Sequence, residues 1–561
     1  METSRAYLDK MVLQLEKLRQ VKRHLLVVSD LHLSEGFNEA EGVWAVNEDF
    51  FFDDPFSRFL QFAERQRARY DGVPWRLVCN GDIFDFRQVG VPRNGEAAPG
   101  VVEERKKQAL RSGSDQIGLS ESEKVYGPGT GRLMSGLRVD LVYQGHRGFF
   151  QALAWFVARG NELVFIKGNH DLELHWPKSQ VGIKRLLAQA YVEAREGVEA
   201  RYDLDWAGLP ERFGLAERQR IFFLPWNYYE PGRVYIEHGQ QFHGTDSQEH
   251  ILWPVLPWDE DVLELSLGEL FGRYFVNELE TLFPLMDNMK PFSKGMNWVL
   301  NKGVPALLTG GDLFGGLKAL GRQLRHALKG ASLIYEKNRK QGQGYPEFYQ
   351  KRQVELEEYG ERIGLGAACA RALDGLKSPP QLRSRRLMSR WLSIRLLEVA
   401  GGFLLFLTLL VALSALALIG AGIAIWGLKR VMMVYSAAGW LGAVLIWWLK
   451  LKMQRLEGHL GERAVQIHQV LHEHGKDVKY VFLGHDHHAD LQRLDAELAR
   501  QYGYSARDCF YVNSGTWTTV IVEDEELVQN ARQFTFVRLV GDTAHLMRWN
   551  DGGGAWEPVV L

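Results

Sequence analysis

The chain has 561 residues, which is long enough for more than one domain and a large buried core. Its formal net charge of −2 gives no basic footprint and so argues against a nucleic-acid partner. Its three widely spaced cysteines argue against a disulfide framework and are typical of a reducing compartment.

The N-terminal stretch METSRAYLDKMVLQLEKLRQ predicts a short amphipathic helix. It has no apolar central region and it contains Asp9 and Glu16, so it does not read as a secretory signal peptide. We therefore expect residues 1–22 to form a helix that precedes the main domain.

Short apolar runs alternate with helix-like stretches in the first part of the chain. Residues 24–30, 75–82 and 162–171 have the composition of strands, and 54–67 and 148–159 have that of helices. This alternation indicates a layered α/β domain.

A mostly helical region separates this domain from a second run of strands. The strand pattern pauses after residues 232–242 and resumes at 478–486, so we interpret the helical region as an insertion into one domain. The expected domains are the helix 1–22, a first part 23–249 with a polar insertion at about 90–131, a helical insertion 250–475, and a second part 476–561.

Two long apolar stretches inside the helical insertion predict a transmembrane hairpin. Residues 399–428 contain no charge, and 431–449 follow after Lys429 and Arg430, whereas about 20 apolar residues suffice to span a bilayer. More basic residues flank the hairpin than lie in its turn, which places both ends in the cytoplasm. The expected location is the inner or cytoplasmic membrane, with the catalytic domain facing the cytoplasm. The alternative is a buried helical pair in a soluble core.

Polar residues with metal-binding potential follow five of the strand-like runs. Such groups collect beyond the carboxyl ends of strands in α/β sheets, so we expect them to meet in one crevice. The mixed oxygen and nitrogen set contains no thiolate, which suits Mn, Fe or Zn better than Ca. It is large enough for two ions that clamp a phosphate and generate a hydroxide nucleophile. The blocks are SDLH (Asp30, His32), NGDIFD (Asp82, Asp85), GNHD (Asn169, His170, Asp171), EHG (His238) and GHDH (His485, His487).

In order and composition the five blocks resemble those of the calcineurin-like metallophosphoesterases, which read D-x-H, G-D, G-N-H-D/E, H and G-H-x-H. The resemblance covers about residues 25–242 and 480–517, and not the helical insertion. It implies an α/β fold with four layers, an α/β/β/α sandwich. With the insertion added, we expect this sandwich to carry a two-helix transmembrane hairpin.

The resemblance also implies a role for each matching residue. Two divalent transition-metal ions are expected, with Mn favoured and Fe or Zn as alternatives. His170 would stabilise or protonate the leaving oxygen, and Asp171 would orient His170. The implied ligands are Asp30, His32 and His487 for the first ion, Asn169, His238 and His485 for the second, and Asp82 as the bridge between them.

Several neighbours of these blocks are open to more than one interpretation. Asp85 is either a hydrogen-bonding support of the site or the N-cap of a helix. His175, His243 and His488 are expected to face solvent or to support the ligands, and the NSGTW segment at 513–517 is expected to be structural.

These observations together favour a membrane-tethered phosphoesterase that hydrolyses a phosphate ester or pyrophosphate with a two-metal hydroxide. Its expected partners are a phosphorylated substrate, lipid-linked if the hairpin brings the site to the bilayer, and the membrane itself. One alternative is a phosphodiesterase for soluble nucleotides or cyclic dinucleotides held at the membrane. The other is a non-catalytic scaffold, a class that usually loses the ligands or the catalytic histidine, both of which this chain retains.

Overall fold

The computed structural model describes residues 4–92, 120–197, 200–280, short pieces between 321 and 333, 345–383, 460–494, 509–518 and 533–559. Its helices are α1 (Ser4–Gln20), α2 (Asp53–Gln66), α4 (Glu123–Tyr126), α5 (Arg132–Gly145), α6 (Arg147–Ala158), α7 (Pro177–Arg195), α8 (Leu215–Arg218), α9 (Leu267–Phe271), α10 (Asn277–Glu280), α14 (Pro346–Arg362), α15 (Ala367–Asp374) and α18 (Leu460–Glu473).

The strands are short, as expected of a layered α/β domain. They are β1 (His24–Val28), β2 (Phe37–Asn38), β3 (Val43–Trp44), β4 (Trp75–Asn80), β5 (Glu162–Ile166), β6 (Ile221–Leu224), β7 (Asn227–Glu230), β8 (Val234–Glu237), β9 (Val255–Leu256), β10 (Asp259–Leu263), β11 (Tyr480–Leu483), β12 (Asp490–Arg493), β13 (Phe510–Asn513), β14 (Thr535–Val540), β15 (Thr543–Asn550) and β16 (Ala555–Pro558).

The larger sheet has seven strands in the order β16-β15-β14-β1-β4-β5-β6. Strands β1, β4, β5 and β6 pair in parallel, while β14 pairs antiparallel to β1. Every residue of β4 and β5 is buried, which is typical of parallel strands covered on both faces. Parallel pairing also brings the carboxyl ends of β1, β4 and β5 to the same edge of the sheet.

The second sheet has five strands in the order β12-β13-β11-β8-β7. Its central strands β8, β11 and β13 are parallel to one another. Strand β8 lies before the predicted helical insertion and β11 lies after it, so segments far apart in the chain form one sheet. The residues that follow β8 and β11 therefore emerge side by side.

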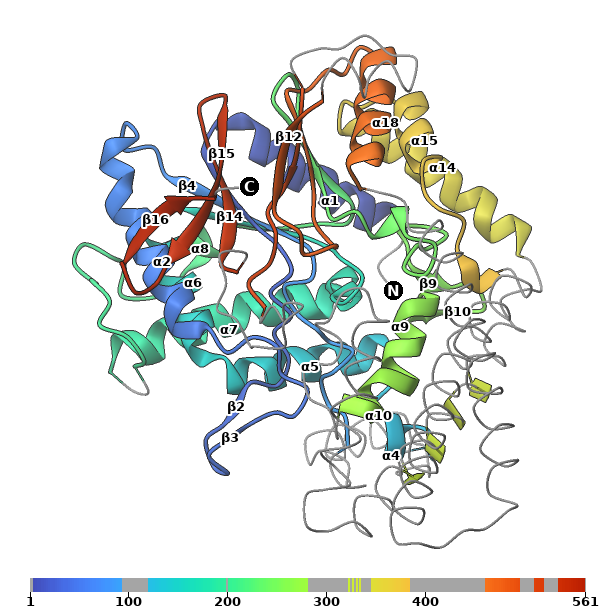
Figure 1. Cartoon of the computed structure of the whole chain (residues 1–561), viewed down its shortest axis with the longest axis horizontal. Helices are drawn as coiled ribbons and strands as arrows, with labels where there is room; N and C mark the ends of the chain where they lie inside the picture. The colour runs from blue at the N-terminus through green and yellow to red at the C-terminus, as the bar shows by residue number, and fades with distance from the viewer. Residues whose placement is uncertain are drawn as a thin grey trace, which may run out of the picture.

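The described elements form four layers, and one hydrophobic cluster lies on each face of the seven-stranded sheet (Figure 1). Leu26 and Phe165 of the seven-stranded sheet belong to the first cluster, with side chains from α2, α6 and α7. Leu25 and Val164, one position away on the same strands, belong to the second cluster, with the five-stranded sheet and helices α1, α15 and α18. Alternation along each strand thus supplies both faces of the sheet with apolar surface.

One buried arginine joins both sheets and the N-terminal helix. The guanidinium of Arg76, on β4, donates to Glu162 Oε2 on β5 at 2.7 Å and to the carbonyl of Leu18 in α1 at 2.8 Å. It also donates to the hydroxyl of Tyr228, on β7 of the other sheet. A fully buried cation needs such partners, because leaving it unpaired would cost several kcal/mol.

The predicted transmembrane hairpin requires a correction. Its legs, 399–428 and 431–449, lie outside the described residues. Within the ranges that the structure describes, no helix is long and apolar enough to cross a membrane. A long described helix such as α7 is amphipathic instead, burying Leu187 while Lys178 and Arg185 are exposed. The structure thus gives no support to the fold class with a membrane hairpin or to the predicted membrane location, and neither is retained.

Candidate metal centre

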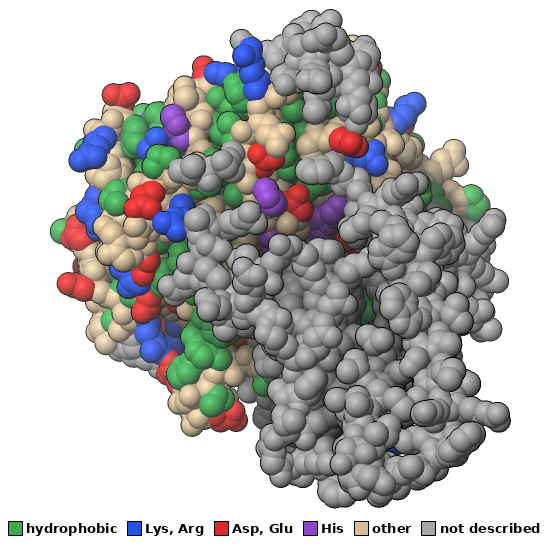
Figure 2. Space-filling model, in the orientation of Figure 1, with side chains coloured by type: hydrophobic (Ala, Val, Ile, Leu, Met, Phe, Trp, Pro, Cys, Tyr) green, Lys and Arg blue, Asp and Glu red, His purple; other side chains and the backbone are tan. Residues whose placement is uncertain are grey.

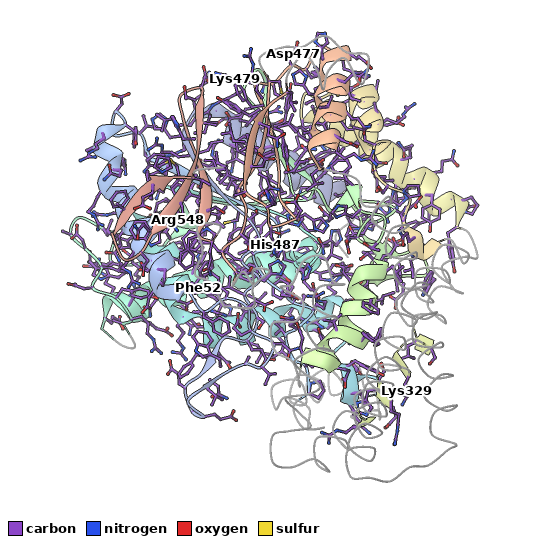
Figure 3. The ribbon with its side chains drawn as sticks, viewed as in Figure 1. Phe52, Lys329, Asp477, Lys479, His487 and Arg548 are labelled. Atoms are coloured by element: carbon purple, nitrogen blue, oxygen red, sulfur yellow. The ribbon has the colours of Figure 1, made fainter. Side chains whose placement is uncertain are left out.

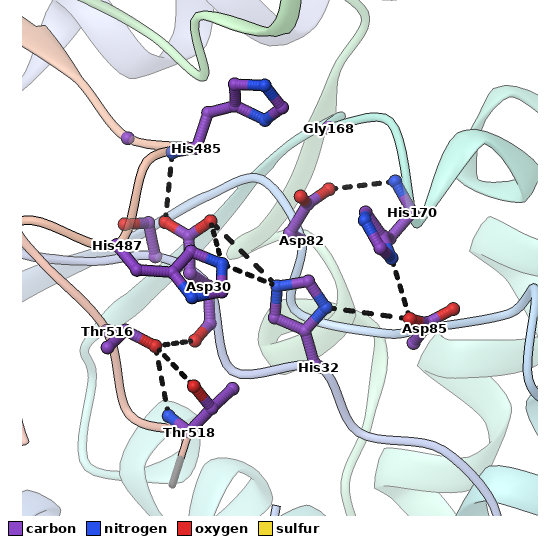
Figure 4. A network of polar contacts seen from close by, with 12 residues as sticks. Asp30, His32, Asp82, Asp85, Gly168, His170, His485, His487, Thr516 and Thr518 are labelled. Carbon is purple, nitrogen blue, oxygen red and sulfur yellow. Dashed lines mark hydrogen bonds and ion pairs between the residues drawn. The ribbon is translucent and has the colours of Figure 1, made fainter. Parts of the chain in front are cut away.

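The five polar blocks lie at the carboxyl ends of central strands from both sheets, and Figure 4 shows residues of four of them. Asp30 and His32 follow β1, Asp82 follows β4, Asn169 follows β5, His238 follows β8, and His485 and His487 follow β11.

Backbone hydrogen bonds fix the loops that carry these blocks against one another. The backbone N–H groups of Leu31 and His32 both donate to the carbonyl of Asp82, at 2.9 Å and 3.0 Å. The backbone N–H of His485 donates to Asp30 Oδ2 at 3.1 Å, which joins a loop of the five-stranded sheet to one of the seven-stranded sheet. The site is therefore built where the two sheets meet.

Most of the predicted ligands have a strained backbone. Among the described residues other than glycine, seven have a positive φ, and five of these are predicted ligands: Asp30 (56°), His32 (56°), Asp82 (52°), His485 (73°) and His487 (60°). Each such residue costs on the order of 1–3 kcal/mol, and strain of this kind collects at functional sites. Its concentration at these five positions makes this region the candidate functional site among the described residues.

The first group of candidate ligands consists of Asp30, His32 and His487. The Nε2 atoms of the two histidines lie 3.2 Å apart. Asp30 Oδ1 lies 3.4 Å from Nε2 of His487 and 4.0 Å from Nε2 of His32. The three ligand atoms thus point toward one another, as Figure 4 shows, and could hold a metal ion.

The second group consists of Asp82, His238 and His485. Asp82 Oδ2 lies 2.9 Å from Nε2 of His238. Nδ1 of His238 donates to the carbonyl of Asn80 at 2.8 Å, which leaves the Nε2 lone pair free for a ligand. Asn169 is adjacent in the chain to His170, whose backbone N–H donates to Asp82 Oδ1 at 2.9 Å. His238 and His485 of the predicted second set therefore lie around Asp82, and Asn169 belongs to the loop whose next residue is hydrogen-bonded to it.

Three buried atoms of these residues fit a cation. Asp30 Oδ1, Asn169 Oδ1 and His485 Nδ1 are buried without a hydrogen-bond partner among the described residues. Leaving such an atom unsatisfied costs about 1–3 kcal/mol, so buried polar atoms in native proteins are normally paired. All three can donate an electron pair, and the grouped histidines and aspartates offer further ligand atoms. The donor set thus fits a metal centre.

The pKa shifts of the metal-free site point in different directions. Burial lowers the pKa of His238, but Asp82 and Asp30 outweigh it and raise it to about 10, so this imidazole must lose a proton when it binds a metal. Burial lowers the pKa of His485 to about 3, so its imidazole is neutral near pH 7, the form that ligates metals. Burial opposes ionisation of Asp82, but His238 and His170 outweigh it and hold the pKa of this carboxyl well below its usual range. Burial, helped by the nearby Asp82, raises the pKa of Asp30 to about 6.

The predicted contact between Asp171 and His170 is wrong. Asp171 accepts backbone hydrogen bonds from Gly168 at 2.6 Å and Ile83 at 3.0 Å, so it braces the loops after β5 and β4. Asp85 contacts the His170 ring instead: its Oδ2 lies 2.6 Å from Nδ1 of His170 and orients the imidazole. Of the two interpretations of Asp85, the contacts favour support of the site.

Two glycines leave room for the ligands. A Cβ atom at Gly168 would lie 2.1 Å from Asp82 Oδ1, and one at Gly81 would lie 2.4 Å from Nδ1 of His238. Gly81 also has a φ of 79°, which glycine adopts without strain. The glycines of these two blocks are therefore required by the close approach of a ligand side chain.

Asp246 is a residue of this region that the sequence did not reveal. Its Oδ2 lies 3.6 Å from Nε2 of His485, and the ring of His243 lies 4.7 Å from that of His485. Asp246 follows no strand directly, so the strand-end pattern could not mark it. His175 lies elsewhere, buried with its ring 4.9 Å from those of Trp176 and Trp253, and does not face solvent as one of its two interpretations had it.

The segment after β13 supports the centre from behind. The hydroxyl of Thr516 donates to the carbonyl of Asp30 at 2.7 Å, and Asn513 Nδ2 donates to Asp486 Oδ1 at 2.7 Å. The first bond holds the backbone of Asp30, and the second holds the side chain of Asp486, which lies between His485 and His487, so the NSGTW segment has a structural role.

The centre reaches the surface near the middle of the face shown in Figures 2 and 3. His487 is labelled there in Figure 3, and Figure 2 shows histidine and acidic side chains gathered at the same place.

Comparison of the chain with protein-family models, with curated proteins and with solved structures found no match. The residues and their geometry are therefore the basis for any functional assignment.

Proposed function

We propose that the protein is a metal-dependent phosphoesterase of the calcineurin-like type, which hydrolyses a phosphate ester or a pyrophosphate. The observation that carries the proposal is the pair of ligand groups, Asp30–His32–His487 and Asp82–His238–His485, at the strand ends of two adjoining sheets. The order of the five sequence blocks supports the same assignment.

In this proposal the centre holds two divalent transition-metal ions, with Mn favoured and Fe or Zn as alternatives. When bound, a pair of such ions supplies charge neutralisation for a phosphoryl group and lowers the pKa of water. Asp82 would serve both ions, because its carboxyl lies close to His238 of one ligand group and interacts electrostatically with His32 of the other. Asn169 would complete the second set through its Oδ1, which has no hydrogen-bond partner among the described residues.

His170 supplies a proton to the leaving oxygen in the proposed reaction. Its Nδ1 is held by Asp85, so Nε2 is the atom that carries the transferred proton. Burial and the nearby Arg87 lower the pKa of His170, and the negative charge of a bound phosphate would raise it again. General acid catalysis of this kind contributes about 10²–10⁴-fold to the rate.

The test is reconstitution of chelator-stripped protein with Mn, Fe or Zn, followed by elemental analysis and activity assays. The substrates are p-nitrophenyl phosphate, bis-p-nitrophenyl phosphate and inorganic pyrophosphate, which separate monoesterase, diesterase and pyrophosphatase activity. We expect about two ions per chain and metal-dependent turnover of at least one substrate class.

Two variants make this test specific. Asp82→Ala is expected to lose both ions, whereas Asp203→Ala, which removes an exposed carboxylate, is expected to keep them. Folded, metal-supplemented wild-type protein that retains no ion would refute the proposed centre. Retention of two ions without turnover of any substrate would favour a non-catalytic scaffold.

A further inference from the structure

We propose that Asp246 is a positioning residue that orients His485 toward the metal centre. The inference rests on the proposed function, because it assumes that His485 is a ligand. It adds a carboxylate that belongs to none of the five sequence blocks.

The two ring nitrogens of His485 have different surroundings. Nε2 lies 3.6 Å from Asp246 Oδ2, which is within ion-pair range and slightly longer than a hydrogen bond. Nδ1 is buried and has no hydrogen-bond partner among the described residues. A carboxylate beside one nitrogen favours the tautomer with the proton on that nitrogen, which leaves the lone pair on the other. Asp246 therefore favours Nδ1 as the ligand atom.

Asp246 lies on a loop that is closed on itself. The side-chain amide of Gln241 accepts from the backbone N–H of Gln248 at 2.7 Å and donates to its carbonyl at 3.3 Å. The backbone N–H of Asp246 donates to the carbonyl of His243 at 2.9 Å. These bonds close the loop after β8, the strand that also leads to the ligand His238.

A second segment braces the same loop from outside. The backbone N–H groups of Ser378 and Gln381 donate to the carbonyls of Gln241 at 2.8 Å and Gly244 at 2.9 Å. Both sides of the loop are thus hydrogen-bonded, which gives the carboxylate a defined place beside His485.

Helix α9 packs against the far side of the Asp246 carboxylate. A Cβ atom at Gly268 would lie 2.1 Å from Asp246 Oδ1, and the backbone N–H of Gly268 donates to the carbonyl of Thr245 at 2.8 Å. The carboxylate therefore lies between the helix and the imidazole, and only glycine at position 268 leaves it room. This contact offers a way to move Asp246 without changing it.

The experiment titrates metal-free full-length protein with Mn²⁺ by calorimetry and follows the His485 tautomer by ¹⁵N NMR of histidine-labelled protein. We expect Asp246→Ala to weaken one of two binding events by about 10- to 100-fold while the other is unchanged, as is typical when the partner of a metal-binding histidine is removed. Asp246→Asn, which keeps an acceptor oxygen, should lose less. In the metal-free protein, Asp246→Ala should also reduce the population with the proton on Nε2.

Gly268→Ala is the second variant. A Cβ atom there would crowd Asp246 Oδ1, so thermal stability is expected to fall whether or not Asp246 positions His485, and the affinity for each ion is the readout. Displacement of the Asp246 carboxylate predicts weaker binding of the same single ion as in Asp246→Ala. If Asp246→Ala does not fold, the Mn²⁺ affinity of Gly268→Ala tests the positioning role of Asp246 on its own.

The outcomes separate this inference from the proposed function. Wild-type protein that binds no ion would refute the metal centre itself. Two ions in wild type with unchanged affinities in Asp246→Ala and Gly268→Ala would refute the positioning role alone. Loss of a third ion on substitution would show that His243, Asp246 and His485 form a binding site of their own and would likewise overturn the inference.

Discussion

Oδ2 of Asp85 lies 2.6 Å from Nδ1 of His170, and the same oxygen lies 2.8 Å from Nη2 of Arg87 and 3.6 Å from Nδ1 of His32. Burial opposes ionisation of this carboxyl, but Arg87 and His170 outweigh it and hold the pKa of Asp85 well below its usual range. One ionised carboxylate thus orients both the proposed proton donor and a predicted metal ligand.

The first prediction concerns this pair. His170→Ala should keep the metal content but lower kcat, by about 10²-fold or more for substrates with poor leaving groups. Asp85→Asn should lower kcat in the same way and should also weaken the binding of one ion, because Asp85 also contacts the predicted ligand His32. The loss should be smaller for p-nitrophenyl phosphate than for phenyl phosphate, because nitrophenolate leaves without a proton. The ratio of kcat values for the two esters is the measurement. An equal loss for both esters would show that His170 does not transfer a proton in the limiting step.

The second prediction concerns metal removal. Without a cation, the buried atoms Asp30 Oδ1 and Asn169 Oδ1 have no hydrogen-bond partner among the described residues, so the stripped protein should be less stable. Free metal at 100 times its Kd should add about 2.7 kcal/mol to the free energy of unfolding for each site. Thermal melts of stripped and reloaded protein measure this difference. Asp82→Ala should show no rise in Tm on reloading, and a rise equal to that of wild type would place the ion elsewhere.

The strand-end residues could be predicted from the sequence because their signal is local. Each block follows an apolar run, and the carboxyl ends of neighbouring parallel strands meet at one edge. The structure brings Asp30, His32 and His487 into one group, and Asp82, His238 and His485 into another. The roles of these residues in catalysis stay predictions.

The contacts that orient the ligands could not be predicted in the same way. The pairing of His170 with Asp85 rather than Asp171 depends on how the loops after β4 and β5 cross, and a sequence pattern does not contain that geometry. Asp246 reaches His485 only because its loop closes through Gln241 and Gln248. The apolar stretches at 399–449 indicate segments that are buried away from water. Hydrophobicity alone does not distinguish a bilayer from other apolar surroundings.

The third prediction concerns a buried ion pair beside the site. His146 lies 3.2 Å from Glu48 Oε2 and 2.9 Å from Asp53 Oδ1. Glu48 in turn accepts backbone hydrogen bonds from Gly36 at 2.6 Å and Phe50 at 2.9 Å, so the pair holds the loop that follows His32. Burial lowers the pKa of His146, but Glu48 and Asp53 outweigh it and raise it to about 10.

A histidine whose pKa is higher in the folded protein stabilises the fold. This stabilisation is fully present below its pKa in the unfolded chain, about 6.5, and is lost as the pH rises through its pKa in the folded protein. His146→Gln should therefore cost about 3–5 kcal/mol at pH 6, and less as the pH approaches 10. Urea unfolding of wild type and variant at several pH values measures the difference. His472→Gln, at an exposed pair with Asp477, should change stability little at either pH. A pH-independent cost for His146→Gln would mean that packing, and not charge, explains the loss.

The last prediction tests the close approach at Gly168. A Cβ atom there would lie 2.1 Å from Asp82 Oδ1 and 2.6 Å from the backbone nitrogen of Asp82, so Gly168→Ala must displace both this loop and the carboxylate that the proposed centre shares between its ions. Position 168 does not have a positive φ, so the substitution adds no backbone strain of that kind. We therefore expect a folded protein with the reduced metal content of Asp82→Ala, measured by elemental analysis. Gly129→Ala is the control, because nothing lies within 4 Å of a Cβ atom at that position. Full metal content in folded Gly168→Ala would show that Asp82 tolerates displacement and does not serve as the bridge.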